Sequence, residues 1–133
     1  MKKIVLIIGL VSILAGSDYS VVISKKSGLS EFSQQQIRDL FLQKRRFMGS
    51  QAIVPVNILG HDDVRSVFES KILQMDRNQL NSYWMKQHFK GVSPPVTQSS
   101  FESVKSFVEN VDGAIGYLPS QMVDQKIRVV YEF

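Results

Sequence analysis

His61 and Arg65 lie four residues apart, and both side chains are of types that contact an anion. Arg65 is expected one turn into a helix and His61 in the loop before it, so a functional interpretation makes the two an anion contact. Asn57 and Gly60 lie in the same loop and complete this group of candidate ligand-binding residues. In the alternative interpretation, Asp62 caps the helix and pairs with Arg65, and His61 is a solvated loop residue.

A second group of candidates follows the first predicted strand. Its members are Ser24, Lys25, Ser27 and Gly28. In open α/β sheets, ligands lie outside the carboxyl ends of the strands, which is the position that this loop would take. The alternative is an ordinary polar loop between a strand and a helix.

The motifs of common catalytic centres are absent from the sequence. It contains no cysteine and two histidines, His61 and His88, which do not stand at metal-ligand spacing, so we expect no metal site. There is no G-x-S-x-G, no H-E-x-x-H and no P-loop, so nucleophilic, metallohydrolase and nucleotide chemistry all lack their parts. We therefore expect a protein that is not an enzyme and has no cofactor.

A run of three cations, Lys44-Arg45-Arg46, precedes Phe47. Such a run can contact the phosphates of phospholipid or lipopolysaccharide. The alternative is a solvated helix end, where the helix dipole favours positive charge.

Residues 1–17 have the pattern of a secretory signal peptide. Two lysines precede the apolar run Ile4–Leu14, and Ala15-Gly16-Ser17 supplies the small residues of a cleavage site. The apolar run is shorter than the roughly 20 residues that span a bilayer. We therefore expect cleavage before Asp18, export to the periplasm, and no transmembrane segment after cleavage.

Length and charge restrict the class of protein further. Without residues 1–17, 14 basic residues face 12 acidic ones, a balance of +2 that is too weak to indicate nucleic-acid binding. Residues 18–133 suit one domain with a single core, without disulfides to support it.

The elements that must position the candidate residues alternate between strand and helix. β-rich or apolar runs predict strands at 19–24, 52–56, 114–118 and 127–131. Helically spaced apolar residues behind capping residues predict helices that begin after Ser33, Asp62 or Asp63, Asp76 and Ser99. This alternation indicates an α/β sandwich.

Two glycines near the third strand have conformational meaning. Gly113 is expected in a turn that needs a positive φ, and Gly116 in a strand packed tightly against a helix. Lining a ligand site is the alternative role for this segment.

Six segments, in this order, resemble the phosphate-type periplasmic substrate-binding proteins: Leu29-Ser30, Gln36–Leu42, Ile53–Asn57, Arg65–Phe68, Tyr83-Trp84 and Gly113–Tyr117. The most specific are I-x-x-L-F-L-x-K at Ile37–Lys44 and D-G-A-I-G-Y at Asp112–Tyr117. The resemblance covers residues 19–117 and is closest to short members with a single lobe. It implies a three-layer α/β sandwich with a mixed, mainly parallel sheet, like one lobe of a type II periplasmic binding protein.

Full-length members of that family have two lobes that close on an oxyanion. At the loop where the family carries an arginine and a Gly-Ser-Gly-Thr run, this sequence has Asn57–Val64, which includes Asp62 and Asp63. Two carboxylates beside an anion repel it, so weak or altered binding of phosphate or another small anion is expected.

The resemblance therefore implies a periplasmic protein like the substrate-binding proteins of phosphate ABC transporters. The alternative is a lobe without a ligand that acts as an interaction module, docking to an envelope transporter or receptor or to a second copy of itself. A homodimer would restore a two-lobed cleft by symmetry.

Overall fold

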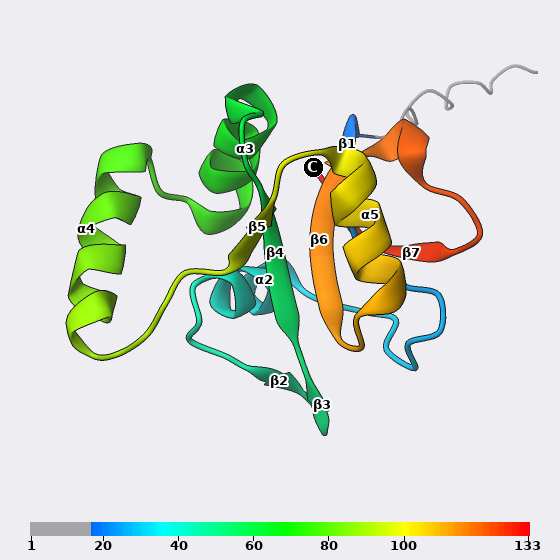
Figure 1. The fold of residues 1–133 in the computed structure, drawn as a ribbon, viewed down its shortest axis with the longest axis horizontal. Coiled ribbons are helices and arrows are strands. Elements are labelled where there is room, and N and C mark those ends of the chain that lie inside the picture. Colours follow the sequence, from blue (N-terminus) through cyan, green and yellow to red (C-terminus); the bar gives the residue numbers. More distant parts are fainter. Residues whose placement is uncertain (1–16) are drawn as a thin grey trace, which may run out of the picture.

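The computed structural model describes residues 17–133 (Figure 1). The predicted signal peptide, residues 1–17, lies outside the described residues except for Ser17. Within residues 17–133, no helix combines the length and the apolar character needed to cross a membrane.

A five-stranded sheet forms the centre of the described chain, in the order β5-β4-β6-β1-β7. The strands are β1 (Tyr19–Ser24), β4 (Val54–Ile58), β5 (Val96–Gln98), β6 (Ala114–Pro119) and β7 (Ile127–Glu132). Strand β4 pairs in parallel with β5 and β6, whereas β1 pairs antiparallel with both β6 and β7. The sheet is therefore mixed: β1 alone runs against the direction shared by the other strands.

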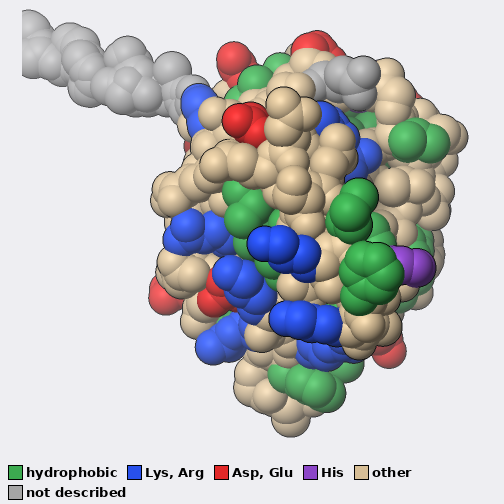
Figure 2. Space-filling view, turned by 90° about the vertical axis from the view of Figure 1, so that its left-hand side faces the viewer, with side chains coloured by type: hydrophobic (Ala, Val, Ile, Leu, Met, Phe, Trp, Pro, Cys, Tyr) green, Lys and Arg blue, Asp and Glu red, His purple; other side chains and the backbone are tan. Residues whose placement is uncertain are grey.

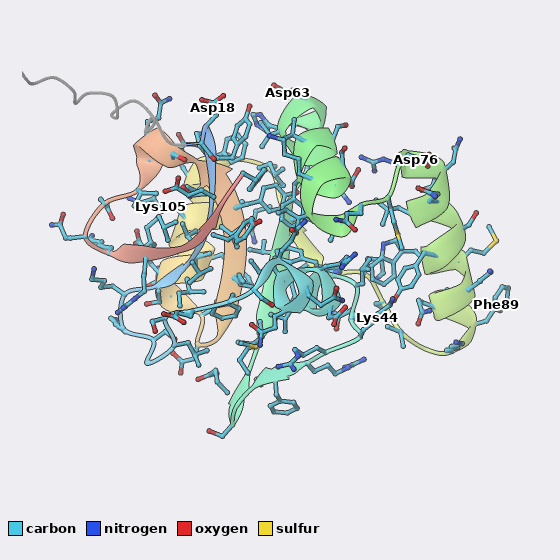
Figure 3. The ribbon with its side chains drawn as sticks, turned by 180° about the vertical axis from the view of Figure 1, so that it is seen from behind. Asp18, Lys44, Asp63, Asp76, Phe89 and Lys105 are labelled. Carbon is cyan, nitrogen blue, oxygen red and sulfur yellow. The ribbon has the colours of Figure 1, made fainter. Side chains whose placement is uncertain are left out.

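Helices cover both faces of the sheet (Figures 1 and 3). They are α2 (Gln34–Phe41), α3 (Asp62–Phe68) with its π-helical extension η2 (Glu69–Leu73), α4 (Arg77–Phe89) and α5 (Phe101–Asn110). On β6, Gly116 faces Val104 and Val108 of α5, whereas the ring of the next residue, Tyr117, packs on Phe41 of α2 and Phe68 of α3. Since successive strand residues point to opposite faces, α5 forms one outer layer and α2 with α3 the other. The expected three-layer sandwich is confirmed.

Capping residues explain where the helices begin. Ser33 and Asp76 form the capping boxes of α2 and α4, as the sequence predicts for their positions. The prediction for α5 is wrong by one residue: Ser100, not Ser99, accepts the hydrogen bond from the backbone N–H of Ser103. The prediction that Asp62 or Asp63 caps α3 is wrong: the N-cap is His61, whose side chain makes no capping hydrogen bond.

Several short elements have no counterpart in the sequence-based prediction. They are the hairpin of β2 (Phe47–Met48) and β3 (Gln51–Ala52), the edge strand β5 and the 3₁₀ turn η3 (Ser120–Met122). Each spans five residues or fewer, which is too short for a periodic pattern to appear.

The predicted roles of both glycines are confirmed. Gly113 has φ +80°, and a Cβ built there would lie 2.0 Å from the carbonyl oxygen of Ala52. A Cβ on Gly116 would lie 2.9 Å from side-chain carbons of Val104 and Val56. Both positions therefore require glycine because the neighbouring chain occupies the space of a side chain.

Gly113→Ala should lower the free energy of unfolding by at least about 2 kcal/mol more than Gly91→Ala. Gly91 has nearly the same φ, +79°, but nothing lies within 4 Å of its built Cβ, so it carries the backbone strain without the clash. Urea denaturation of both variants measures the difference. Equal losses would mean that strain alone makes Gly113 necessary.

Candidate functional site

The direction of β1 separates the two groups of candidate residues. The first residue of β1, Tyr19, pairs with the last residue of β6, Pro119, so β1 ends where β6 begins. Since β4 is parallel to β6, the loop after β4 lies at the other end of the sheet from the loop after β1. We call the end at which β4, β5 and β6 finish the carboxyl edge, and the other end the opposite edge.

The group after β1 therefore lies at the opposite edge. Ser24 and Lys25 line a hollow of about 370 Å³ together with Lys126 and Glu109. The Ser24 hydroxyl accepts a hydrogen bond from the backbone N–H of Lys26, and the Ser27 hydroxyl accepts one from Leu29. These bonds are those of a polar turn, the alternative role that the sequence left open. Gly28 follows in the same loop, with open space at its Cβ position.

The group after β4 lies at the carboxyl edge, but its members face different surroundings. Asn57 is buried at 7% exposure, and its Oδ1 accepts a hydrogen bond of 2.7 Å from the hydroxyl of Tyr117. Gly60 takes φ +86° in the turn before α3. The ring centroid of His61 lies 4.6 Å from that of Phe101. Asn57 is thus held by the core, and Gly60 and His61 shape the start of α3.

Arg65 is held by a carboxylate of the protein itself. Its Nε lies 3.0 Å from Oε2 of Glu69, and its Nη1 donates to the carbonyl oxygen of Ile58. The other carboxylate oxygen of Glu69 lies 3.1 Å from a guanidinium nitrogen of Arg77. Glu69 is only 5% exposed, so its charge needs these partners. The sequence analysis did not name Glu69, although its position four residues after Arg65 on a helix is a pairing signal.

The buried side chain of Tyr117 connects Asn57 to the aromatic core. Its ring stacks on Phe68 with centroids 4.0 Å apart and an interplanar angle of 8°. Burial raises the pKa of the Tyr117 hydroxyl well above its usual value, an effect that the charge of Arg65 opposes. The hydroxyl therefore stays protonated and keeps donating to Asn57.

A polar hollow of about 410 Å³ at the carboxyl edge reaches the first turn of α3. It is lined by Ser17, Asp18, Tyr19, Val64, Pro119, Ser120 and Gln121. The Ser120 hydroxyl donates to the carbonyl oxygen of Ser17 and lies 2.8 Å from the Ser20 hydroxyl. Ser120 was missed by sequence reasoning, although it follows the end of a strand parallel to β4 and so had to share its edge.

Two carboxylates lie at this end of the molecule. Asp18 lines it, and Asp63, in the same first turn of α3 as Val64, is exposed at the same end of the molecule (Figure 3). The first backbone N–H groups of a helix have no partner within the helix and can donate to a ligand. The hollow can therefore hydrogen-bond a small polar solute, while the carboxylate of Asp18 in its lining disfavours an anion. Among the described residues, no group of three His, Cys, Asp or Glu side chains is arranged to hold a metal.

Comparison with solved structures defines the class of fold. The chain is similar to a protein assigned as a phosphate ABC transporter substrate-binding protein from Clostridium perfringens, solved with bound phosphate, with a TM-score of 0.70 and 18% identity. It is also similar to an ABC-type phosphate transport receptor from Vibrio cholerae, with a TM-score of 0.68 and 16% identity. No protein-family model and no curated protein matches the sequence.

These matches cover most of this chain but less than half of each solved protein. Each covers 90% of this chain but only 46% or 47% of the solved protein, so the chain spans about half the length of either structure. The described residues therefore have the fold of one lobe of a phosphate-type periplasmic binding protein, and the resemblance stated from the sequence is confirmed at the level of the fold.

Tyr117→Phe should lower the free energy of unfolding by about 1.5 kcal/mol, because it leaves the buried Asn57 oxygen without its donor. The control is Tyr131→Phe, which removes a hydroxyl that lies 3.4 Å from Gln34 in a part-buried position. The control should lose less than about 0.5 kcal/mol. Similar losses in urea denaturation would contradict a special role for the Tyr117–Asn57 bond.

Arg65→Ala should destabilise the fold by about 2 kcal/mol, because the buried Glu69 loses one of its two cationic partners. Lys71→Ala, an exposed cation in η2, is the matched control and should change stability by less than about 0.5 kcal/mol. If Arg65 acts through Glu69, its loss should cost clearly less in a Glu69→Gln background. Additive losses in thermal unfolding would show that the two side chains act independently.

Proposed function

We propose that this chain is a binding protein rather than an enzyme: an exported, solute-binding-like lobe that takes a small polar solute weakly at its carboxyl edge. The observation that supports this proposal is the polar hollow beside the first turn of α3, in a fold shared with phosphate-binding proteins of ABC transporters. Cleavage before Asp18 would remove Ser17, whose carbonyl oxygen accepts from the Ser120 hydroxyl, so this hydroxyl would become free to donate to the solute. The periplasm is the proposed location, with residues 1–17 as the signal peptide.

Phosphate is a poor ligand for this site, for two physical reasons. Asp18 and Asp63 bring two carboxylates to this end of the molecule, one of which would be offset by the α-amino group that cleavage creates at Asp18, and the guanidinium of Arg65 is engaged by Glu69. At about 4 Å, each like-charge contact costs about 1 kcal/mol even in bulk water, or about fivefold in affinity. The binding of phosphate is therefore expected to be weak, as the sequence analysis predicted.

A second candidate function is supported by the internal pairing of Arg65. If the lobe binds no solute, it acts as an interaction module for an envelope transporter or receptor. A single lobe also offers only one wall of a cleft, so a ligand bound to it stays exposed to water.

Asp18→Asn combined with Asp63→Asn should strengthen phosphate binding about tenfold at low ionic strength, because both substitutions remove charge beside the hollow. Amide NMR titration with phosphate measures the affinity and locates it. Shifts are expected at Val64 and Ser120, which line the hollow.

The matched control is Glu31→Gln with Asp112→Asn, which makes the same change in net charge toward the opposite edge. It should leave phosphate affinity within about twofold, because exposed charges beyond a Debye length are screened. No saturable shift at Val64 or Ser120 in either variant would reject the solute site and favour the interaction module.

A further inference from the structure

Charge is divided sharply between two parts of the described chain. Residues 40–61 and 77–101 contain six basic residues and no Asp or Glu. The rest of the described chain holds all twelve acidic residues and eight basic ones. The net charge of +2 is thus the sum of +6 in these two segments and −4 in the rest of the described chain. The two basic segments attract negatively charged surfaces.

The fold brings the two basic segments together. The hydroxyl of Tyr83, on α4, donates to the carbonyl oxygen of Leu42 at 2.6 Å, and Lys44 Nζ lies 5.9 Å from the centre of the Tyr83 ring. A hollow of about 360 Å³, with Arg46 and Val96 in its lining, lies between the segments. Lysine and arginine side chains gather on this side of the molecule (Figure 2).

We call this surface the basic face and define it by its exposed residues: Lys44, Arg45, Arg46, Phe47, Met85, Lys86, Phe89 and Lys90. Its five cations have no carboxylate within salt-bridge distance among the side chains that the structure describes. Arg77, the sixth cation of the basic segments, is excluded because it pairs with Glu69. The five cations of the basic face are therefore not tied up in ion pairs with these side chains.

Large apolar side chains protrude between these cations. Phe89 is 83% exposed, Met85 65% and Phe47 53%. Met85 and Phe89 are one turn apart on α4, and Lys86 and Lys90 form the adjacent row, so the outer side of this helix end presents an apolar row beside a basic one. Figure 3 shows Phe89 at the outer side of α4, away from the sheet.

We propose that the basic face docks onto the phosphate-bearing headgroups of an anionic phospholipid bilayer. Lysine and arginine side chains are attracted to anionic headgroups, and exposed aromatic and apolar side chains beside them can enter the headgroup region. Three of the five cations are lysine, which is depleted at protein–protein interfaces, and the apolar side chains protrude instead of lining a concave site. The membrane would thus hold the lobe by its α4 side, independently of the solute site at the carboxyl edge.

The test uses protein purified from the envelope of the cells that express it, so that it carries its natural N-terminus. Sedimentation with vesicles of phosphatidylcholine plus about 30% phosphatidylglycerol is compared with phosphatidylcholine alone, at low salt and then at about 0.15 M. Stronger binding to the anionic vesicles, weakened by salt, is expected. Equal binding to both kinds of vesicle, or none, would overturn the proposal.

Lys86→Gln with Lys90→Gln should lower the partition coefficient into anionic vesicles at least tenfold at low salt, since each cation near an anionic surface contributes about fivefold. The matched control, Lys25→Gln with Lys26→Gln, makes the same charge change at the opposite edge and should lower it less than about threefold. Equal losses in both pairs would show attraction by net charge alone and would overturn the assignment to this face.

Phe89→Ser tests how much the insertion of an apolar side chain contributes to vesicle binding, apart from the contribution of charge. It should weaken binding to anionic vesicles several-fold without altering the salt dependence, because it removes apolar burial and no charge. Light scattering without lipid tests whether a second copy of the chain, instead of lipid, binds the basic face. A dimer that Lys86→Gln with Lys90→Gln dissociates would overturn the lipid assignment, and a monomer would support it.

Discussion

The arrangement of the whole lobe depends on the central strand β1, which makes antiparallel hydrogen-bonded ladders to β6 on one side and to β7 on the other. Val21 and Val22 are fully buried and point to opposite faces of the sheet, so β1 is covered on both sides, and its register with β7 shifts between these two residues. The reversed direction of β1 decides which loops share an edge. It brings the start of the described chain beside Ser120 and α3, and it sends the loop after β1 to the opposite edge.

The carboxyl edge is built on polar groups that satisfy one another. Glu69 lies between the guanidinium groups of Arg65 and Arg77, and Asn57 accepts from the Tyr117 hydroxyl beneath. A buried carboxylate without partners is strongly unfavourable, so these side chains are committed to the fold. This commitment is the physical difference between an arginine that can hold a ligand and one that stabilises a helix.

Charge is distributed along the molecule in the same uneven way. The carboxylate of Asp18 lines the hollow of the carboxyl edge, whereas cations and protruding apolar side chains occupy the basic face around α4. Electrostatics thus disfavours a negatively charged solute at the carboxyl edge and favours a negatively charged surface at the basic face. Because the two sides balance to a small net charge, total charge describes neither of them.

Local physics in the sequence determined much of this protein. Capping boxes at Ser33 and Asp76, the strand 19–24 and the glycines at 113 and 116 follow from periodicity, hydrogen-bonding capacity and the missing Cβ, and the structure has all of them. Strand direction, by contrast, leaves no mark on a strand's own residues, because both faces of β1 are apolar whichever way it runs. Only the tertiary structure could separate Ser24 from Arg65, place Arg77 on the buried carboxylate of Glu69, and join two distant basic segments into one face, since each depends on contacts between segments that are distant in the sequence.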